Sequence, residues 1–335
     1  MGWQPVILEA ADRPAGSWPR YYDSLTLFSP ARCGSLPEMP FDGDLDRCPH
    51  RDVVITCLLR YTDRLDADIR TRTRVLEVSY GDGAFGLSLE DGSQLEARAA
   101  VAATGAFGRP HRPDLPGLAG YAGAVLHSAN YRSPEPFTGQ RVVVVGAGNS
   151  AVQRAAECAR VTPAARHAVR FARQRTLGRY LHLWLARTGL DTQAVGRFLS
   201  TPPTQPVIDD GRYRRAVIAG RPDRRPLFTG ISETKVIRAD GAAEDVDTIL
   251  LATSYRPDLG RLAPLGTFST SGHPRHREGV PLAHPGLVHV GLGWQRSLPS
   301  NSLRGVGRDA VRAVRHVAAH LAHIGEAGLG SGRAG

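Results

Sequence analysis

The chain contains almost no lysine: Lys235 is the only one, so 41 of its 42 basic residues are arginines. Set against 32 acidic residues, they give a net charge of +10. A nucleic-acid-binding protein usually gathers its basic residues in one patch, whereas these arginines are spread along all 335 residues. The bias toward arginine, alanine, glycine and proline is typical of a GC-rich genome, and we expect no nucleic-acid partner.

Cysteine is also scarce, with four residues: Cys33, Cys48, Cys57 and Cys158. No two of them are spaced as CxxC, and none follows a zinc-binding pattern. We therefore expect four free thiols in a reducing compartment and no metal site. The same spacing argues against a disulfide reductase, because that chemistry needs two neighbouring cysteines for exchange.

Long apolar runs are missing as well: no stretch approaches the ~20 residues that a membrane-spanning helix needs. The first residues, Met1 to Pro5, lack the charged and then apolar layout of a signal peptide. With 41% hydrophobic and 22% charged residues, the composition is that of an ordinary folded protein, and the length favours two domains. We expect a cytoplasmic protein without a membrane partner.

The strongest motif lies in residues 141–153, where four consecutive valines precede Gly146, Gly148 and Ala151. The valines predict a buried parallel strand, and a helix is expected over residues 151–159. The GxGxxA spacing is that of a dinucleotide fingerprint: the first glycine makes the turn, the second admits a pyrophosphate, and the alanine lets helix and strand pack closely. The pyrophosphate would lie at the helix N-terminus, where free N–H groups attract it.

The next strand, expected over residues 160–167, indicates which nicotinamide cofactor is bound. Its end offers Arg166, then Arg170 and Arg173, and no acid. An acid here would bind a ribose diol, whereas arginines favour a 2′-phosphate. We expect NADP(H) rather than NAD(H), although Pro163 costs this strand one ladder hydrogen bond.

Two segments repeat one design. In the first, turns at 81–83 and 90–92 lead into a strand that ends in Ala-Thr-Gly at 103–105. In the second, a turn at 240–241 leads into a strand that ends in Ala-Thr-Ser at 252–254. Small residues at a strand end let a cofactor approach the backbone closely. The pair predicts an α/β fold with two Rossmann-like dinucleotide-binding domains.

Two further helices can be predicted from the spacing of apolar residues. A long one follows Asn301 or Ser302, either of which can cap it, and Gly325 is expected to end it. A short one covers Arg179–Thr188. We interpret it as a packing helix inside the NADP-binding domain, with the wall of a substrate passage as the alternative.

At this point the sequence resembles a known family, the class B flavin-dependent monooxygenases, and in particular bacterial flavin-containing-monooxygenase-like oxidoreductases. The likeness runs from Val6 to Arg312. Residues 16–18 resemble the GGxW segment beside the flavin, and residues 146–151 resemble the NADPH fingerprint. The family's FxGxxxHxxxY linker resembles four residues of this chain, with tyrosine for the first phenylalanine: Tyr121, Gly123, His127 and Tyr131.

The resemblance implies an FAD-binding domain interrupted by an NADP-binding domain. The FAD-binding domain would comprise residues 1–135 and 259–325 and the NADP-binding domain residues 136–258, with a disordered tail at 326–335. Glu9 would bind the adenosine ribose, the backbone of Val75 the adenine, and the N-terminus of the last helix the flavin pyrimidine oxygen.

The full sets of cofactor-binding residues follow from the same likeness. For FAD they are Glu9, Gly16, Ser17, Trp18, Val75, Ala103, Thr104, Gly105, Trp294, Ser302 and Leu303. For NADP they are Gly146, Gly148, Asn149, Ser150, Ala151, Arg166, Arg170, Thr253 and Ser254.

The chain departs from the family in two places. The first strand, GxGxxG turn and helix of the FAD-binding domain are missing, so we expect a misplaced start or a fragment, a sheet with two unpaired parallel edges, and weak FAD binding. The family also has an asparagine near the flavin, in a loop that corresponds to residues 24–32 here. This loop has no asparagine, and Ser29 and Arg32 are weak substitutes as catalytic candidates.

The resemblance implies an FAD- and NADPH-dependent monooxygenase. It would insert one oxygen atom of O₂ into a small organic substrate through a C4a-(hydro)peroxyflavin. One alternative is a flavoprotein NADPH reductase or oxidase without oxygenation, and another is a truncated, non-catalytic NADP(H)-binding protein. A homodimer is compatible with the sequence.

Overall fold

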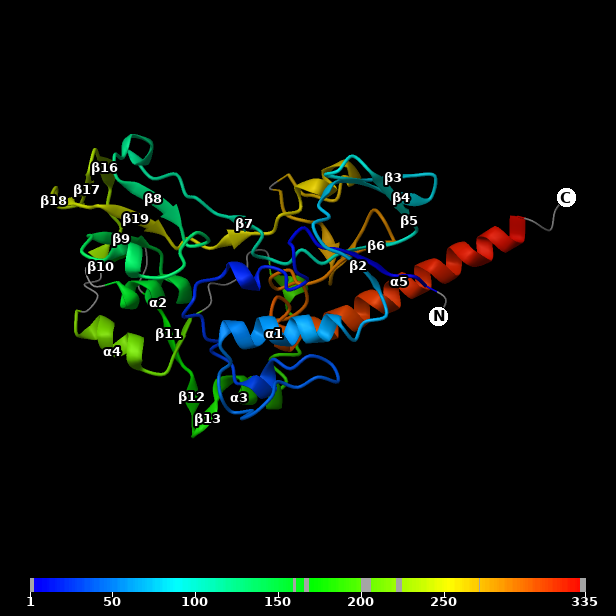
Figure 1. Ribbon diagram of the computed structural model, residues 1–335, viewed down its shortest axis with the longest axis horizontal. Helices are drawn as coiled ribbons and strands as arrows, with labels where there is room; N and C mark the ends of the chain where they lie inside the picture. The colour runs from blue at the N-terminus through cyan, green and yellow to red at the C-terminus, as the bar shows by residue number, and fades with distance from the viewer. Residues whose placement is uncertain are drawn as a thin grey trace.

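The computed structural model describes residues 3–158, 161–165, 169–199, 206–220, 225–270 and 272–331. The chain forms two lobes, one built on a five-stranded parallel sheet and the other on smaller sheets and the longest helix (Figure 1). The five-stranded lobe corresponds to the predicted NADP-binding domain. The second lobe contains the segments expected to bind FAD.

Five parallel strands form the sheet of the NADP-binding lobe, in the order β15-β10-β9-β19-β8. They are β8 (Ala124–His127), β9 (Val142–Val145), β10 (Val161–Ala165), β15 (Arg225–Pro226) and β19 (Thr248–Leu251). Every residue of β9 and β19 is buried, as expected of central strands covered on both faces. The valine run is therefore a core strand, as predicted.

Different elements cover the two faces of this sheet. Helix α2 (Asn149–Glu157) packs Ala151 and Ala155 against Val142 and Val144 of β9. The alternate valines of β9 face a meander made of β16 (Gly230–Ser232), β17 (Lys235–Ile237) and β18 (Ala243–Asp245). Alternate side chains of one strand thus supply both hydrophobic clusters of the lobe.

Smaller elements follow between β10 and β15. The parallel pair β11 (Phe171–Arg173) and β14 (Val207–Asp209) and helix α4 (Arg212–Ile218) pack beside α2. The antiparallel pair β12 (Arg175–Thr176) and β13 (Arg179–Tyr180) and helix α3 (Leu181–Arg187) instead lie away from the five-stranded sheet (Figure 1). The helix predicted over 179–188 is α3, but it packs against Phe28 of the FAD-binding part, so the expectation of a packing helix inside the NADP-binding domain was wrong. Its position beside the second lobe is described with the site below.

Two separate pairs of parallel strands lie in the FAD-binding lobe: β1 (Val6–Leu8) with β2 (Asp68–Arg70), and β6 (Ala100–Ala102) with β23 (Leu287–His289). Val6, Ile7 and Val101 are 44%, 39% and 51% exposed. Among the described strands, β1 and β6 each pair with one neighbour only. Each of these two pairs therefore has open edges among the described strands.

The remaining elements of this lobe are an antiparallel meander, a hairpin and two helices. They are β3 (Val75–Gly81), β4 (Ala84–Leu89), β5 (Gln94–Ala97), β21 (His276–Arg277), β22 (Val280–Pro281), α1 (Arg51–Thr62) and α5 (Leu303–Ser331). Where the chain passes between the lobes, β7 (Arg109–Pro110) pairs with β20 (Tyr255–Arg256) (Figure 1). None of the helices in the described ranges is long and apolar enough to cross a membrane.

Two predicted boundaries differ from the structure. Strand β8 starts at Ala124 and pairs with β19, so the NADP-binding sheet begins before residue 136. Helix α5 continues past Gly325 to Ser331, because a glycine can remain in helical conformation, and the start of the predicted disordered tail is helical. Residues 332–335 lie outside the described residues.

Candidate active site

The turn between β9 and α2 has the geometry that a dinucleotide fingerprint needs. Gly146 has a φ of +148°, and a Cβ added there would lie 2.4 Å from the carbonyl oxygen of Ala252. The same Cβ would lie 3.2 Å from the Cβ of Ala151, which is fully buried. Only glycine fits at 146, and the small residue at 151 keeps α2 close to the strand.

Gly148 differs from Gly146 because a Cβ there would meet nothing within 4 Å. The position that a Cβ would take at Gly148 is open space at the N-terminus of α2, where free N–H groups favour a pyrophosphate. Asn149 accepts a hydrogen bond from the backbone N–H of Ile208 at 3.1 Å, which ties the first turn of α2 to β14. Arg170 is exposed, and Arg166 lies outside the described residues.

The first half of the linker motif anchors β8 to the NADP-binding sheet. The Tyr121 hydroxyl donates to the carbonyl oxygen of Val246 at 2.7 Å in a buried position. A Cβ on Gly123 would lie 2.5 Å from that hydroxyl and 2.8 Å from the carbonyl oxygen of Asp247. The glycine is required by this close approach, so the motif spacing reflects packing.

His127, the next motif residue, fixes the end of β19. It is 1% exposed. Its Nδ1 accepts from the N–H of Ala129 at 3.0 Å, so its Nε2 donates to the carbonyl oxygen of Ser254 at 3.1 Å. Burial lowers the pKa of His127, which keeps the ring neutral. Ser254 has a φ of +74° at the position where the family has glycine.

Tyr131, the last motif residue, joins a cluster that connects the two lobes. Its hydroxyl donates to Glu157 at 2.7 Å. The guanidinium carbon of Arg154 on α2 lies 4.3 Å from the ring centroid of Tyr22 and 5.3 Å from that of Tyr131. Tyr22 comes from the FAD-binding part of the sequence, yet it packs in the hydrophobic cluster of β9 and α2. Composition and spacing gave no signal for this contact.

Several of the residues expected to bind FAD lie at strand ends. Glu9 follows β1, and one of its carboxylate oxygens accepts from the N–H of Ala11 at 2.8 Å. Among the described residues the other oxygen has no partner, so it is available to a ribose hydroxyl. In the segment beside the expected flavin, Gly16 has a φ of +57°, Ser17 hydrogen bonds to the Tyr21 hydroxyl at 2.8 Å, and the ring of Trp18 packs edge-on against Tyr21.

The carboxyl ends of β6 and β23 meet, which brings together Thr104 and the loop that contains Trp294. A Cβ on Gly291 would lie 3.5 Å from the Cα of Gly105. Ala103 and Thr104 are exposed at this edge. A Cβ on Gly196 would lie 1.9 Å from the carbonyl oxygen of Trp294, so the segment after α3 packs directly against this loop.

The start of α5 is held by an ion pair to the NADP-binding lobe. Arg304 contacts Asp191 through two hydrogen bonds of 3.0 and 3.2 Å. The Ser302 hydroxyl donates to the carbonyl oxygen of Pro299 at 2.7 Å, and the carbonyl oxygen of Ser302 accepts from the N–H of Val306 at the start of α5. Leu303 packs beside Phe41 and Val54.

Comparison with known proteins agrees with this geometry. Residues 1–186, more than half of the chain, match the family described as pyridine nucleotide-disulphide oxidoreductase. A flavin-containing monooxygenase from Stenotrophomonas maltophilia superposes with a TM-score of 0.81, at 30% identity over 94% of this chain and 91% of that one.

The chain belongs to this family. It is a flavoprotein oxidoreductase of the flavin-containing-monooxygenase type, with FAD and NADPH as cofactors. An uncharacterized CzcO-like oxidoreductase of Geobacillus kaustophilus is 27% identical over 322 residues, covering 94% of this chain and 91% of that protein. Indole-3-pyruvate monooxygenase YUCCA1 of Oryza sativa is 29% identical over 294 residues, covering 77% of this chain and 72% of that protein.

The residues of this flavoprotein fit the two cofactors to different extents. The glycine-rich turn at 146–151 leaves room for the NADPH pyrophosphate. On the FAD side, Glu9 suits the ribose, and the exposed Ala103 and Thr104 after β6 suit the close approach of a cofactor. The described residues form no second glycine-rich turn of the GxGxxG kind for the FAD pyrophosphate.

The cysteines of this family member are not arranged for disulfide exchange. All four are free, with Cys57 and Cys158 buried and Cys33 and Cys48 partly so. Burial raises the pKa of each thiol and so disfavours the reactive thiolate. The family description names disulphide chemistry, but these thiols are poor candidates for it.

The two catalytic candidates lie in different surroundings. Arg32 is exposed and forms an ion pair with Asp46 at 2.8 Å. Ser29 is half-buried and follows Phe28, whose carbonyl oxygen accepts from Gln174 at 3.0 Å. The ring of Phe28 stacks on His182 of α3 with 5.8 Å between centroids. The loop expected near the flavin therefore contacts Gln174 and α3.

Two buried histidines were not identified from the sequence. His182 on α3 and His289 at the end of β23 are 1% and 0% exposed, and neither ring has a hydrogen-bond partner within the described ranges. Burial lowers the pKa of each to about 4. Single histidines in apolar segments carry no pattern that separates these two from exposed ones.

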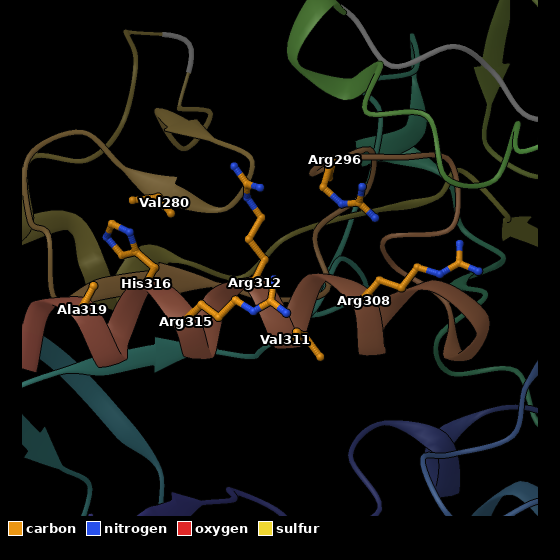
Figure 2. A pocket seen from close by; sticks show the side chains of 8 residues that line it. All are labelled: Val280, Arg296, Arg308, Val311, Arg312, Arg315, His316 and Ala319. Atoms are coloured by element: carbon orange, nitrogen blue, oxygen red, sulfur yellow. The ribbon is translucent and has the colours of Figure 1, made fainter. Parts of the chain in front are cut away.

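A basic groove of about 530 Å³ lies on the outer face of α5 (Figure 2). Its arginines are partly neutralised, Arg296 by Asp309 at 2.8 Å and Arg312 by Glu278 at 2.9 Å. Arg308 and Arg315 extend along the helix surface (Figure 2). None of the residues predicted to bind a cofactor lines this groove.

Proposed function

We propose that the protein catalyses the NADPH-dependent insertion of one oxygen atom of O₂ into a small organic substrate. The balanced reaction consumes substrate, O₂, NADPH and a proton and yields the oxygenated product, NADP⁺ and water. FAD, when bound, supplies the hydride acceptor and the site of reaction with O₂. The substrate class that suits this chemistry is a soft nucleophile or a ketone.

The chain's own residues bind and orient the cofactors. Gly146 and Gly148 would let the NADPH pyrophosphate approach the first turn of α2. The exposed Arg170 would meet a 2′-phosphate near the end of β10. Glu9 would accept a hydrogen bond from the FAD ribose, and the first residues of α5 would direct their N–H groups at the flavin pyrimidine.

One observation carries this proposal: elements of the two predicted cofactor sites are in direct contact. Tyr22, which follows the Gly16–Trp18 segment, packs in the same hydrophobic cluster as α2. Trp294, from the loop before α5, lies against Gly196, which the sequence contributes from between β10 and β15 of the NADP-binding sheet. Hydride transfer needs the nicotinamide and the flavin side by side, and these contacts hold their binding elements together.

Incorporation of ¹⁸O tests the proposal. The purified chain is incubated with FAD, NADPH, ¹⁸O₂ and a panel of sulfides, amines and ketones, and product mass is measured together with hydrogen peroxide. We expect one ¹⁸O atom per product molecule and less peroxide when a substrate is present. NADPH oxidation that yields only peroxide on every substrate would instead establish the reductase or oxidase alternative.

The non-catalytic alternative makes a different prediction. A chain that binds NADPH but stays colourless after incubation with excess FAD would be an NADP(H)-binding protein without flavin chemistry.

Because O₂ and NADPH are both available in the cytoplasm and the four thiols are free, we place the protein there. We also propose that the protein forms a homodimer. The molecular mass of the purified protein in solution tests this.

A further inference from the structure

Arg154 is a buried cation at the boundary between the two lobes. Its residue exposure is 3%, and it forms no ion pair with any residue that the structure describes. The Nε atom is buried without a hydrogen-bond partner in the same ranges. Burial accordingly lowers the pKa of its guanidinium. An apolar side chain would fill this space without the desolvation cost, so packing alone does not account for a charge here.

The groups around Arg154 come from both lobes. Nη1 donates to the carbonyl oxygen of Ser150 at 3.0 Å, in the first turn of α2. Nη2 donates to the carbonyl oxygen of Ser128 at 3.3 Å, just after β8. The guanidinium plane lies over the ring of Tyr22, which comes from the FAD-binding part. A cation over an aromatic face in a desolvated place is attracted strongly to it.

Neighbouring residues of α2 hold the same segment. Gln153 accepts from the Tyr22 hydroxyl, and Glu157 accepts from Ser24. Residues 153, 154 and 157 of α2 therefore bind residues 22–24 together. Trp18, beside the expected flavin, precedes Tyr22 by four residues, and Ser150, beside the expected pyrophosphate, precedes Arg154 by four residues.

A cavity of about 500 Å³ lies beside this contact. It is lined by Tyr22, Ser24, Gln153 and Glu157, with Arg212 and Tyr213 of α4, whereas Arg154 itself does not line it. A change in the first turn of α2 would shift the guanidinium through the carbonyl of Ser150.

We propose that Arg154 is a positioning residue that couples NADP(H) binding at the start of α2 to the segment 16–22 on the flavin side. The guanidinium transmits the position of the first helical turn to the ring of Tyr22. It sets where the nicotinamide lies relative to the flavin and does not itself touch either cofactor. The inference deepens the proposed function by assigning a residue to the reductive step, which precedes any reaction with O₂.

Hydrogen–deuterium exchange tests the coupling without requiring activity. In the unmodified chain, NADP⁺ should slow exchange in residues 16–26 as well as in α2. The Arg154→Met variant should keep the slowing in α2 and lose it in residues 16–26, while Arg154→Lys should retain part of it because a cation remains over the ring. The exposed Arg187→Met serves as the matched control and should behave as the unmodified chain.

Flavin reduction gives a second readout. With the chain loaded with FAD, the limiting rate of reduction by NADPH should fall about tenfold in Arg154→Met, with a change in NADPH Kd below about threefold. Reduction by dithionite should be unaffected. Should Arg154→Met fail to fold, Tyr22→Leu and Tyr22→Phe replace it: the leucine variant should lose the coupling and the phenylalanine variant should retain it.

Three results would overturn the inference: no NADP⁺-dependent change at 16–26 in the unmodified chain, an undiminished change in Arg154→Met, or a rise in Kd with an unaltered reduction rate. Failure of the proposed oxygenation leaves these readouts intact, because none of them involves O₂ or a substrate. Failure to bind FAD leaves the exchange experiment intact.

Discussion

Arg304 and Asp191 form a two-pronged, largely buried ion pair between the first turn of α5 and the segment after α3. The two side chains are 14% and 5% exposed. The pair joins the helix expected to face the flavin with the segment that follows α3. It fixes the start of α5 against that segment.

Removing one partner of this pair should destabilise the protein strongly. Asp191→Asn or Arg304→Met leaves the charge of the remaining partner buried and unpaired. We therefore expect the free energy of unfolding in urea to fall by about 3–5 kcal/mol. Arg60 and Asp42, which form an ion pair with side chains 52% and 77% exposed, provide the control. Arg60→Met should cost less than about 1 kcal/mol. Equal losses at the two pairs would contradict this.

The two glycines of the fingerprint should respond differently to alanine. Gly146→Ala places a Cβ 2.4 Å from a backbone oxygen, so unfolding should become easier by about 1–3 kcal/mol or more. Gly148→Ala meets no atom of the protein and should keep stability within about 0.5 kcal/mol. It should nevertheless weaken NADP⁺ binding about tenfold in calorimetry, because the new methyl occupies the pyrophosphate approach. Unchanged affinity in Gly148→Ala would refute the predicted site.

Ser254 has a left-handed conformation with a φ of +74°. Ser254→Gly removes the cost that an L side chain incurs there and should raise the free energy of unfolding by about 1 kcal/mol. Ser254→Ala, which keeps the Cβ, should leave stability unchanged. A stabilisation by both variants would show that the hydroxyl, and not the backbone conformation, is responsible.

Buried histidines should make stability depend on pH. Burial, with a smaller contribution from nearby His276, lowers the pKa of His289 from 6.5 to about 4. The unfolded chain therefore binds a proton at higher pH than the folded one, so stability is present above pH 6.5 and is lost as the pH falls toward about 4. His182, with its pKa also lowered to about 4, adds to this slope.

Thermal unfolding between these two pH values measures the effect. His289→Leu should flatten the pH dependence of the midpoint, and the double variant with His182→Phe should flatten it further. The exposed His323→Gln should leave the slope as it is. A slope that survives the double variant would assign the pH dependence to other groups.

Arg170 should decide between the two nicotinamide cofactors. Its exposed side chain follows the strand that would carry the 2′-phosphate contact, so Arg170→Ala should weaken NADP⁺ binding about tenfold and leave NAD⁺ binding nearly unchanged. Arg187→Ala is the control for loss of one exposed positive charge. Equal weakening of both cofactors by Arg170→Ala would exclude a phosphate contact.

Local patterns sufficed for much of the architecture. The valine run at 142–145 and the GxGxxA spacing identified β9 and α2, because strand burial and turn geometry depend on residues that are neighbours in sequence. The two strand ends at 103–105 and 252–254 were found in the same way. The linker motif predicted positions but not roles, which proved to be hydrogen bonds that hold β8 and α2 in place.

The sequence by itself determined the NADPH fingerprint at 146–151 and the two strand ends at 103–105 and 252–254, since each depends on a short stretch of chain. Only the tertiary structure decided that β8 belongs to the NADP-binding sheet, that Tyr22 crosses into the other lobe, and that His182 and His289 are buried. The hydrogen bond between Tyr22 and Gln153 joins residues 131 positions apart. Contacts between residues so far apart in sequence depend on how the two lobes pack. A pattern of neighbouring residues cannot predict that packing.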